Sequence, residues 1–138
     1  MGSAALRRAR RRSKERRGPL NLWTTAYILA WLRAFAFTQL VEAPIYRGLV
    51  KARWTVALGA SAITHPFVWF AFPYLRLVPG IGYLAMVIVA ELFAWLVEAV
   101  YLRLVLRISW RRAVLASLAA NSASLGLGIL MRSLTGYP

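Results

Sequence analysis

The side chains best suited to chemistry in this chain are a few acids, one histidine and one asparagine inside apolar stretches. Glu91 and Glu98 are seven residues apart, which places them on one face of an α-helix, two turns from each other. His65 and Glu91 fall at similar depth in neighbouring stretches, about 12–15 Å from one membrane side at ~1.5 Å per helical residue. A charge at the centre of a membrane helix costs roughly 2.5–3.5 kcal/mol, so each is a functional candidate.

A later stretch carries a small and polar face that could meet these acids. Ser117, Asn121, Ser124 and Gly128 follow i, i+4, i+7, i+11 spacing, which suits close contact between membrane helices. Asn121 falls at mid-depth, and Arg33 or Glu42 can join from the first stretch. We therefore expect one intramembrane polar cluster, which consists of Glu42, His65, Glu91, Glu98 and Asn121.

Three roles are open for this cluster. The first is interhelical hydrogen bonding, which membrane bundles use because lipid supplies no hydrophobic drive between helices. The second is a path for protons or ions, since carboxylates and imidazole suit proton relay. The third is a metal or cofactor site, with His65, Glu91 and Glu98 as candidate metal ligands. Carboxylates favour a hard or borderline metal, and a lone histidine could instead ligate a tetrapyrrole.

Several classes of enzyme are excluded by composition. The chain has no Cys and no Asp, which removes thiolate metal sites, cysteine nucleophiles and a Ser-His-Asp triad. Its single His rules out motifs that need two. Glu91 and Glu98 are not adjacent, as a paired-glutamate protease would require, and no glycine-rich phosphate loop is present. We expect no catalytic residues, and the sequence identifies no cofactor.

The elements that must position these residues are membrane helices. The chain has 138 residues, of which 60% are hydrophobic, yet its net charge is +14. Apolar stretches over residues 22–43, 54–73, 81–106 and 109–134 are each long enough to cross a hydrocarbon core of ~30 Å. The expected fold class is all-α, a small polytopic helical membrane bundle over residues 21–138. We find no convincing internal repeat in the sequence.

A basic tail precedes the bundle. Residues 1–20 hold seven Arg and one Lys against one Glu, and Gly18-Pro19 ends the charge run. Such a tail is typical of a solvated cytoplasmic segment, and it could dock onto anionic lipid headgroups or an acidic partner. Nucleic acid is not expected, because no aromatic residue is interleaved for base stacking. The residues expected to dock are Arg7, Arg8, Arg10, Arg11, Arg12, Arg16 and Arg17.

The basic residues also bear on topology. The connections near residues 44–53 and 103–112 are basic, and with a cytoplasmic tail four spans would place both outside, against the positive-inside rule. The first stretch is therefore expected to be interfacial or re-entrant, or else to cross with the help of a partner. We expect an integral protein of a prokaryotic inner membrane with its N-terminus in the cytoplasm.

These features favour a non-catalytic accessory or scaffold subunit of a larger membrane complex. Its partners would be other membrane subunits or further copies of itself. The alternative is an oligomeric transporter of protons, ions or small solutes that uses Glu91, Glu98 and His65. A metal- or cofactor-binding intramembrane protein or enzyme is the third possibility.

Overall fold

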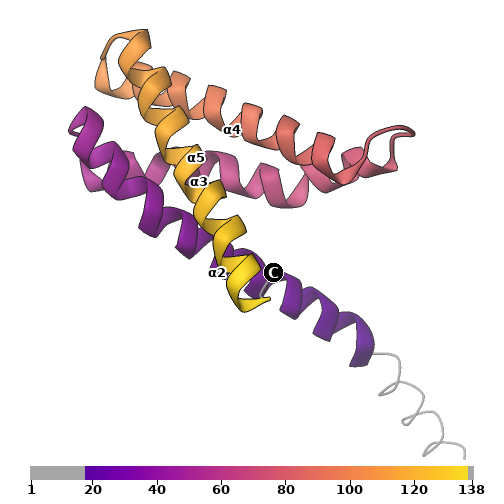
Figure 1. Cartoon of the computed structure of the whole chain (residues 1–138). Coiled ribbons are helices and arrows are strands. Elements are labelled where there is room, and N and C mark those ends of the chain that lie inside the picture. The colour runs from indigo at the N-terminus through magenta and orange to yellow at the C-terminus, as the bar shows by residue number, and fades with distance from the viewer. Residues whose placement is uncertain (1–17, 137–138) are drawn as a thin grey trace, which may run out of the picture. The chain divides into compact units, whose positions relative to one another are not determined.

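The structure, a computed structural model, describes the backbone of residues 18–136 and the side chains from residue 24 to residue 136. Its elements are helices joined by short connections, and residues 18–136 contain no strand. Figure 1 shows their order, and their bounds are α2 Gly18–Val50, α3 Trp54–Phe70, the 3₁₀ helix η1 Phe72–Leu77, α4 Tyr83–Leu106 and α5 Trp110–Thr135.

The chain forms two compact units, Met1–Arg33 and Ala34–Pro138. In the first unit, the described residues 18–33 form the beginning of α2. The described part of the second unit, residues 34–136, contains the rest of α2 and all the other elements, and is called the bundle below.

Four helical segments are long and apolar enough to cross a membrane. They are Thr24–Val50, Trp54–Leu77, Tyr83–Leu106 and Trp110–Thr135. Large apolar side chains stay on their outer surfaces, as Leu40 and Leu104 do with exposed fractions of 76% and 67%. An apolar surface of this kind suits lipid. The expected all-α fold with four membrane-length helices is confirmed.

The first helix differs from its expected form. It continues through Pro44 to Val50, whereas the sequence placed its end at residue 43. Proline removes one backbone donor, but a helix can continue through it when neighbouring helices hold the segment in place. Ala43 and Tyr46, on either side of Pro44, are buried against those neighbours. α2 is also a single helix over Gly18–Val50, without a break inside the first apolar stretch.

The second helix ends earlier than its expected end at residue 73. α3 stops at Phe70, and the chain continues as η1, with a proline in the first turn of this 3₁₀ helix. Pro73 has no N–H to extend the α-helical ladder, whereas the start of a new helix tolerates it. Pro66 lies inside α3 without ending it.

The bundle consists of two helical hairpins whose connections have the same form. Lys51 and Arg107 follow α2 and α4 with positive φ angles of 57° and 53°. Each is followed two residues later by an extended N-cap, and each next helix begins with a tryptophan, Trp54 or Trp110. Both connections lie at the same end of the bundle (Figure 1).

The two hairpins also match along their lengths, at a spacing of 56 residues from Glu42 to Glu98. The segment LVEA occurs at residues 40–43 and again at residues 96–99. Gln39 Nε2 donates to the Leu58 carbonyl at 3.0 Å, and 56 residues later Trp95 Nε1 donates to the Val114 carbonyl at 3.1 Å. The expectation of no repeat was wrong, because the identical positions are scattered among many that differ between the two hairpins.

The interior of the bundle is built mainly from alanine. Small side chains let helix backbones approach closely, which is how helices associate in lipid. Tyr46 and Leu102 are the largest apolar side chains that are completely buried, and they are counterparts in the repeat. The buried alanines are Ala43, Ala52, Ala57, Ala60, Ala90, Ala94, Ala99, Ala113, Ala116 and Ala120.

Close packing at these alanines predicts a position-specific response to larger side chains. Ala120→Leu adds three carbons at a site with 0% exposure and should destabilise the bundle by about 1–3 kcal/mol, the usual cost of overpacking. Ala119→Leu, on the exposed face of the same helix, is the matched control. Thermal unfolding in detergent measures both, and equal melting temperatures for the two variants would contradict this packing.

Candidate functional site

Glu98 lies at the centre of a hydrogen-bond network that reaches three other helices. Its side chain is 1% exposed. The hydroxyl groups of Tyr46 on α2 and Thr64 on α3 donate to its carboxyl oxygens, the second at 2.6 Å. Asn121 Nδ2 on α5 donates at 2.7 Å. One carboxyl group on α4 therefore contacts α2, α3 and α5.

Glu42 plays a corresponding part on α2. It is 2% exposed, and its carboxyl oxygens accept hydrogen bonds from Ser61 on α3 and Ser124 on α5, the latter at 2.6 Å. Glu42 and Glu98 occupy the same position in the two hairpins. The repeat thus places two carboxyl groups in the interior, and each is bonded to both hairpins.

The donors to these two carboxyl groups are all neutral. A carboxylate only accepts hydrogen bonds, and its two oxygens offer about four lone-pair sites. Hydroxyl and amide donors fill five of these sites in total, and within residues 24–136 neither Glu42 nor Glu98 forms an ion pair. The network therefore ties the four helices together by interhelical hydrogen bonds.

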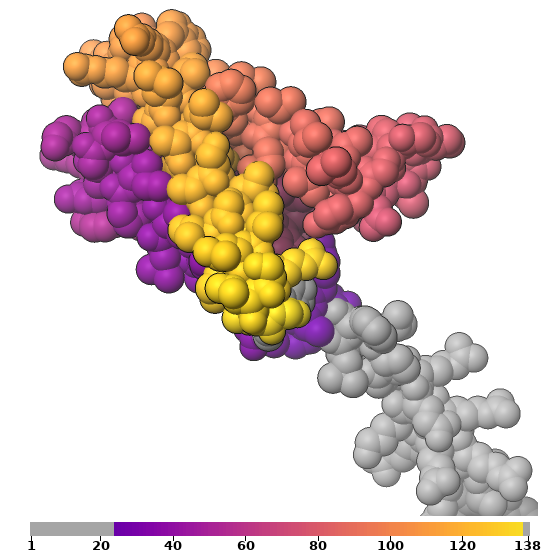
Figure 2. Space-filling model, viewed as in Figure 1, coloured from indigo at the N-terminus to yellow at the C-terminus, as the bar shows by residue number. Residues whose placement is uncertain are grey.

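A cavity of about 320 Å³ lies beside this network. Glu42, Glu98 and Asn121 line it near the packed end, and Tyr83 and Arg132 line it near the ends of α4 and α5 that point away from the basic connections. Figure 2 shows this side of the bundle, where α5 (yellow) and the beginning of α4 (salmon) separate. Other lining residues are Ala34, Phe37, Thr38, Ser61, Thr64, His65, Val68, Trp69, Glu91, Ala94, Ser124, Leu125, Gly128 and Ile129.

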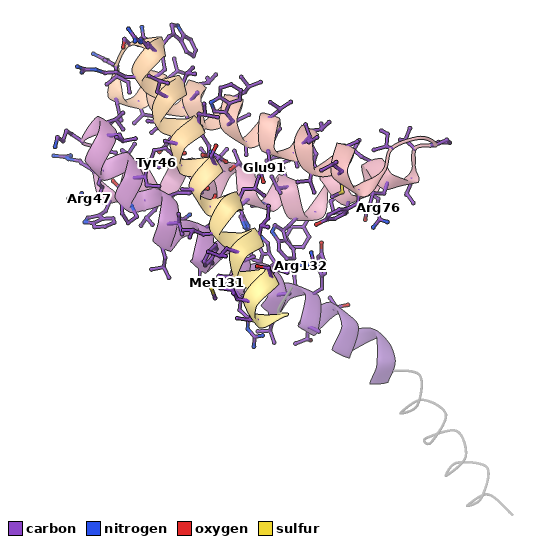
Figure 3. The ribbon with its side chains drawn as sticks, viewed as in Figure 1. Tyr46, Arg47, Arg76, Glu91, Met131 and Arg132 are labelled. Carbon is purple, nitrogen blue, oxygen red and sulfur yellow. The ribbon has the colours of Figure 1, made fainter. Side chains whose placement is uncertain are left out.

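Two polar side chains of the cavity wall have surroundings unlike those of the network. The His65 ring contacts Phe35 and Trp69, with ring centroids 5.1 and 6.0 Å apart. Glu91 is partly exposed and forms no hydrogen bond or ion pair with the described residues. Figure 3 labels Glu91 on α4 and Arg132 on α5. Glu91 is therefore a polar group of the cavity that takes no part in the hydrogen bonds between helices.

The five residues expected to form a polar cluster all line this one cavity. Ser124 and Gly128 from the small and polar face of α5 line it too, whereas Ser117 lies outside the lining and donates to the Trp95 carbonyl at 2.8 Å. Arg33 belongs to the other compact unit. The seven arginines expected to dock onto lipid lie outside the described residues.

The described part of the chain contains no ligand set that matches the expected metal site. No three His, Cys, Asp or Glu side chains there come close enough together to hold a metal ion. His65, Glu91 and Glu98 share the cavity, but each points into different surroundings: aromatic rings, open space and the hydrogen-bond network.

Sequence reasoning missed three donors, Tyr46, Ser61 and Thr64. Tyr46 follows Glu42 by one helical turn, and Ser61 and Thr64 are three residues apart on one face of α3, so helical spacing could have placed them with the cluster. The stronger signal was the repeat, since Ser61 corresponds to Ser117 on the polar face that was recognised.

Comparisons of the chain with models of protein families, with curated proteins and with solved structures find no match.

The network predicts which tyrosine hydroxyl stabilises the bundle. Tyr46→Phe removes a buried donor to Glu98 and should lower the free energy of unfolding by about 1–3 kcal/mol, because an acceptor loses its partner. Tyr101→Phe is the matched control, since the Tyr101 hydroxyl forms no hydrogen bond in residues 24–136. Chemical unfolding in mixed micelles measures both variants.

A double-mutant cycle sharpens this test. Once Glu98→Gln has changed the acceptor, adding Tyr46→Phe should cost less than it does in the parent chain, because the two groups share one interaction. Additive losses, or an equal loss from Tyr101→Phe, would contradict the network.

Proposed function

We propose that the chain is a small integral membrane carrier, an oligomeric transporter of protons, ions or small solutes that uses the cavity as its binding site. The observation that carries this proposal is a cavity between two repeated hairpins whose mainly apolar wall contains the polar side chains of Glu42, Glu91, Glu98 and His65. In carriers built from repeats, the substrate site lies near the bilayer midplane at the repeat interface. An oligomer is part of the proposal because four helices enclose little space.

Glu91 separates this proposal from the scaffold that the sequence favours. In a scaffold, the buried polar side chains would be engaged in hydrogen bonds between helices, as those of Glu42 and Glu98 are. Glu91 instead faces a cavity without a bonded partner among the described residues, at a depth where a charge is costly. A binding role gives this carboxyl group a reason to be there.

An accessory subunit of a membrane complex remains the second candidate. It is favoured by the interhelical network, which would keep a small chain rigid enough to hold other subunits. Partners that copurify in fixed stoichiometry from the native membrane would support it.

For location, we propose a prokaryotic inner membrane with both chain termini in the cytoplasm. If all four membrane-length helices cross, the two basic connections lie on the other side and hold seven Lys and Arg. The cytoplasmic side then holds ten, the eight of residues 1–20 together with Arg76 and Arg132, so the total number of basic residues favours this orientation even though both basic connections lie outside. The cavity would open towards the cytoplasm.

Transport is expected to depend on Glu91. In liposomes that contain the purified chain and a pH-sensitive dye, a proton or potassium gradient should give a protein-dependent flux, and Glu91→Gln should reduce it to the level of protein-free liposomes. Leu92→Ala changes a neighbouring exposed residue and should leave the flux intact. Flux that is unchanged in Glu91→Gln, or absent from the parent chain for every ion tried, would contradict the carrier for protons and ions.

The orientation can be mapped with single cysteines, because the chain has none of its own. With a membrane-impermeant thiol reagent on intact cells, Arg53→Cys in the α2–α3 connection should be labelled. Ser3→Cys in the tail and Leu77→Cys in η1 should react only after the cells are broken. Labelling of Arg53→Cys and Leu77→Cys from the same side would contradict the proposed topology.

A further inference from the structure

Around the cavity the two repeated hairpins carry different side chains at several matching positions. Lining positions that are alike in the two hairpins make helix contacts, as Glu42 and Glu98 do. Among the lining positions that differ, Asn121 also makes a helix contact, whereas Glu91 forms no hydrogen bond within residues 24–136. The clearest differences are Glu91 in place of Phe35, Asn121 in place of His65 and Leu125 in place of Trp69.

The effect of these differences is to make the two sides of the cavity unlike. One hairpin contributes His65 and Trp69 where the other has Asn121 and Leu125, and the other contributes the Glu91 carboxyl group where the first has Phe35. Phe37, which matches Phe93 in the repeat, also lines the cavity. A carboxyl group and aromatic faces around one space are the groups that recognise an organic cation, through charge and through cation–π attraction. Tyr83 adds a further aromatic ring to the lining.

The composition of the cavity disfavours other ligands. Three carboxyl groups against one guanidinium, that of Arg132, oppose an anion. An inorganic divalent ion needs several convergent ligands, and among residues 24–136 no three His, Cys, Asp or Glu side chains come together to supply them. The volume of about 320 Å³ is within the range of pockets for small organic molecules.

We propose that Glu91 and the aromatic rings of Phe37 and Trp69 bind an organic ammonium ion in this cavity. The proposal rests on the proposed carrier function and names its substrate class. The ammonium group lies against the Glu91 carboxylate, its carbon substituents contact the aromatic faces, and the Glu42–Glu98 network forms the polar end of the site.

Isothermal titration of the purified full-length chain in detergent tests the proposal with two probes of the same shape. Choline carries a quaternary ammonium group, and 3,3-dimethyl-1-butanol replaces its nitrogen by carbon. Choline should bind saturably and the neutral alcohol at least about tenfold more weakly, since one lost charge contact of ~1.4 kcal/mol is tenfold in affinity. Tetramethylammonium should compete with choline.

Choline binding by single-residue variants tests which side chains form the site. Glu91→Gln should weaken choline binding by about tenfold or more while leaving the melting temperature unchanged, because Glu91 makes no helix contact through hydrogen bonds in the described chain. Phe37→Leu should weaken it as well, and Leu92→Ala should not. Equal binding of the two probes, or unchanged choline binding in Glu91→Gln, overturns the proposal.

The flux assay keeps the two proposals apart. If the parent chain conducts protons or potassium in a Glu91-dependent way but binds neither choline nor tetramethylammonium, the ammonium site is overturned and the carrier stands. If it shows neither flux nor binding, both fall.

Discussion

The structure depends on two carboxyl groups that are buried among neutral donors. In lipid, helices gain little from burying apolar surface against one another, so close packing and hydrogen bonds must hold them. Glu42 and Glu98 each accept hydrogen bonds from side chains on two or more other helices, and each is almost fully buried. Removing either group would leave hydroxyl or amide donors without acceptors in an apolar medium, which is costly.

The repeat explains how so short a chain arranges this network. Each hairpin carries a glutamate on its first helix and a serine at the matching position of its second, Ser61 or Ser117, and each closes with a three-residue connection followed by a tryptophan. Buried alanines at matching positions, such as Ala57 and Ala113, let the helices approach. A frame built twice from the same residues can differ on its cavity side without losing its packing.

Much of the fold was predictable, because membrane-length apolar runs and their ends depend on local composition. The sequence also selected five of the polar residues that line the cavity, from the cost of placing such groups inside apolar helices. It failed at Pro44, which would end most helices in water but is tolerated when α2 packs on its neighbours. It failed again for Tyr46 and Thr64, whose contacts with Glu98 join helices that are distant in the sequence.

The most direct test of the central claim is whether the network exists in a bilayer. Rotational-echo double-resonance NMR on the full chain in lipid can measure coupling between glutamate carboxyl ¹³C and asparagine side-chain ¹⁵N. The contact between Asn121 and Glu98 predicts strong dephasing of one carboxyl signal, which is lost in Asn121→Ala. If no carboxyl signal is dephased at hydrogen-bond range, the four helices are not joined through Glu98, and the account of the bundle is wrong.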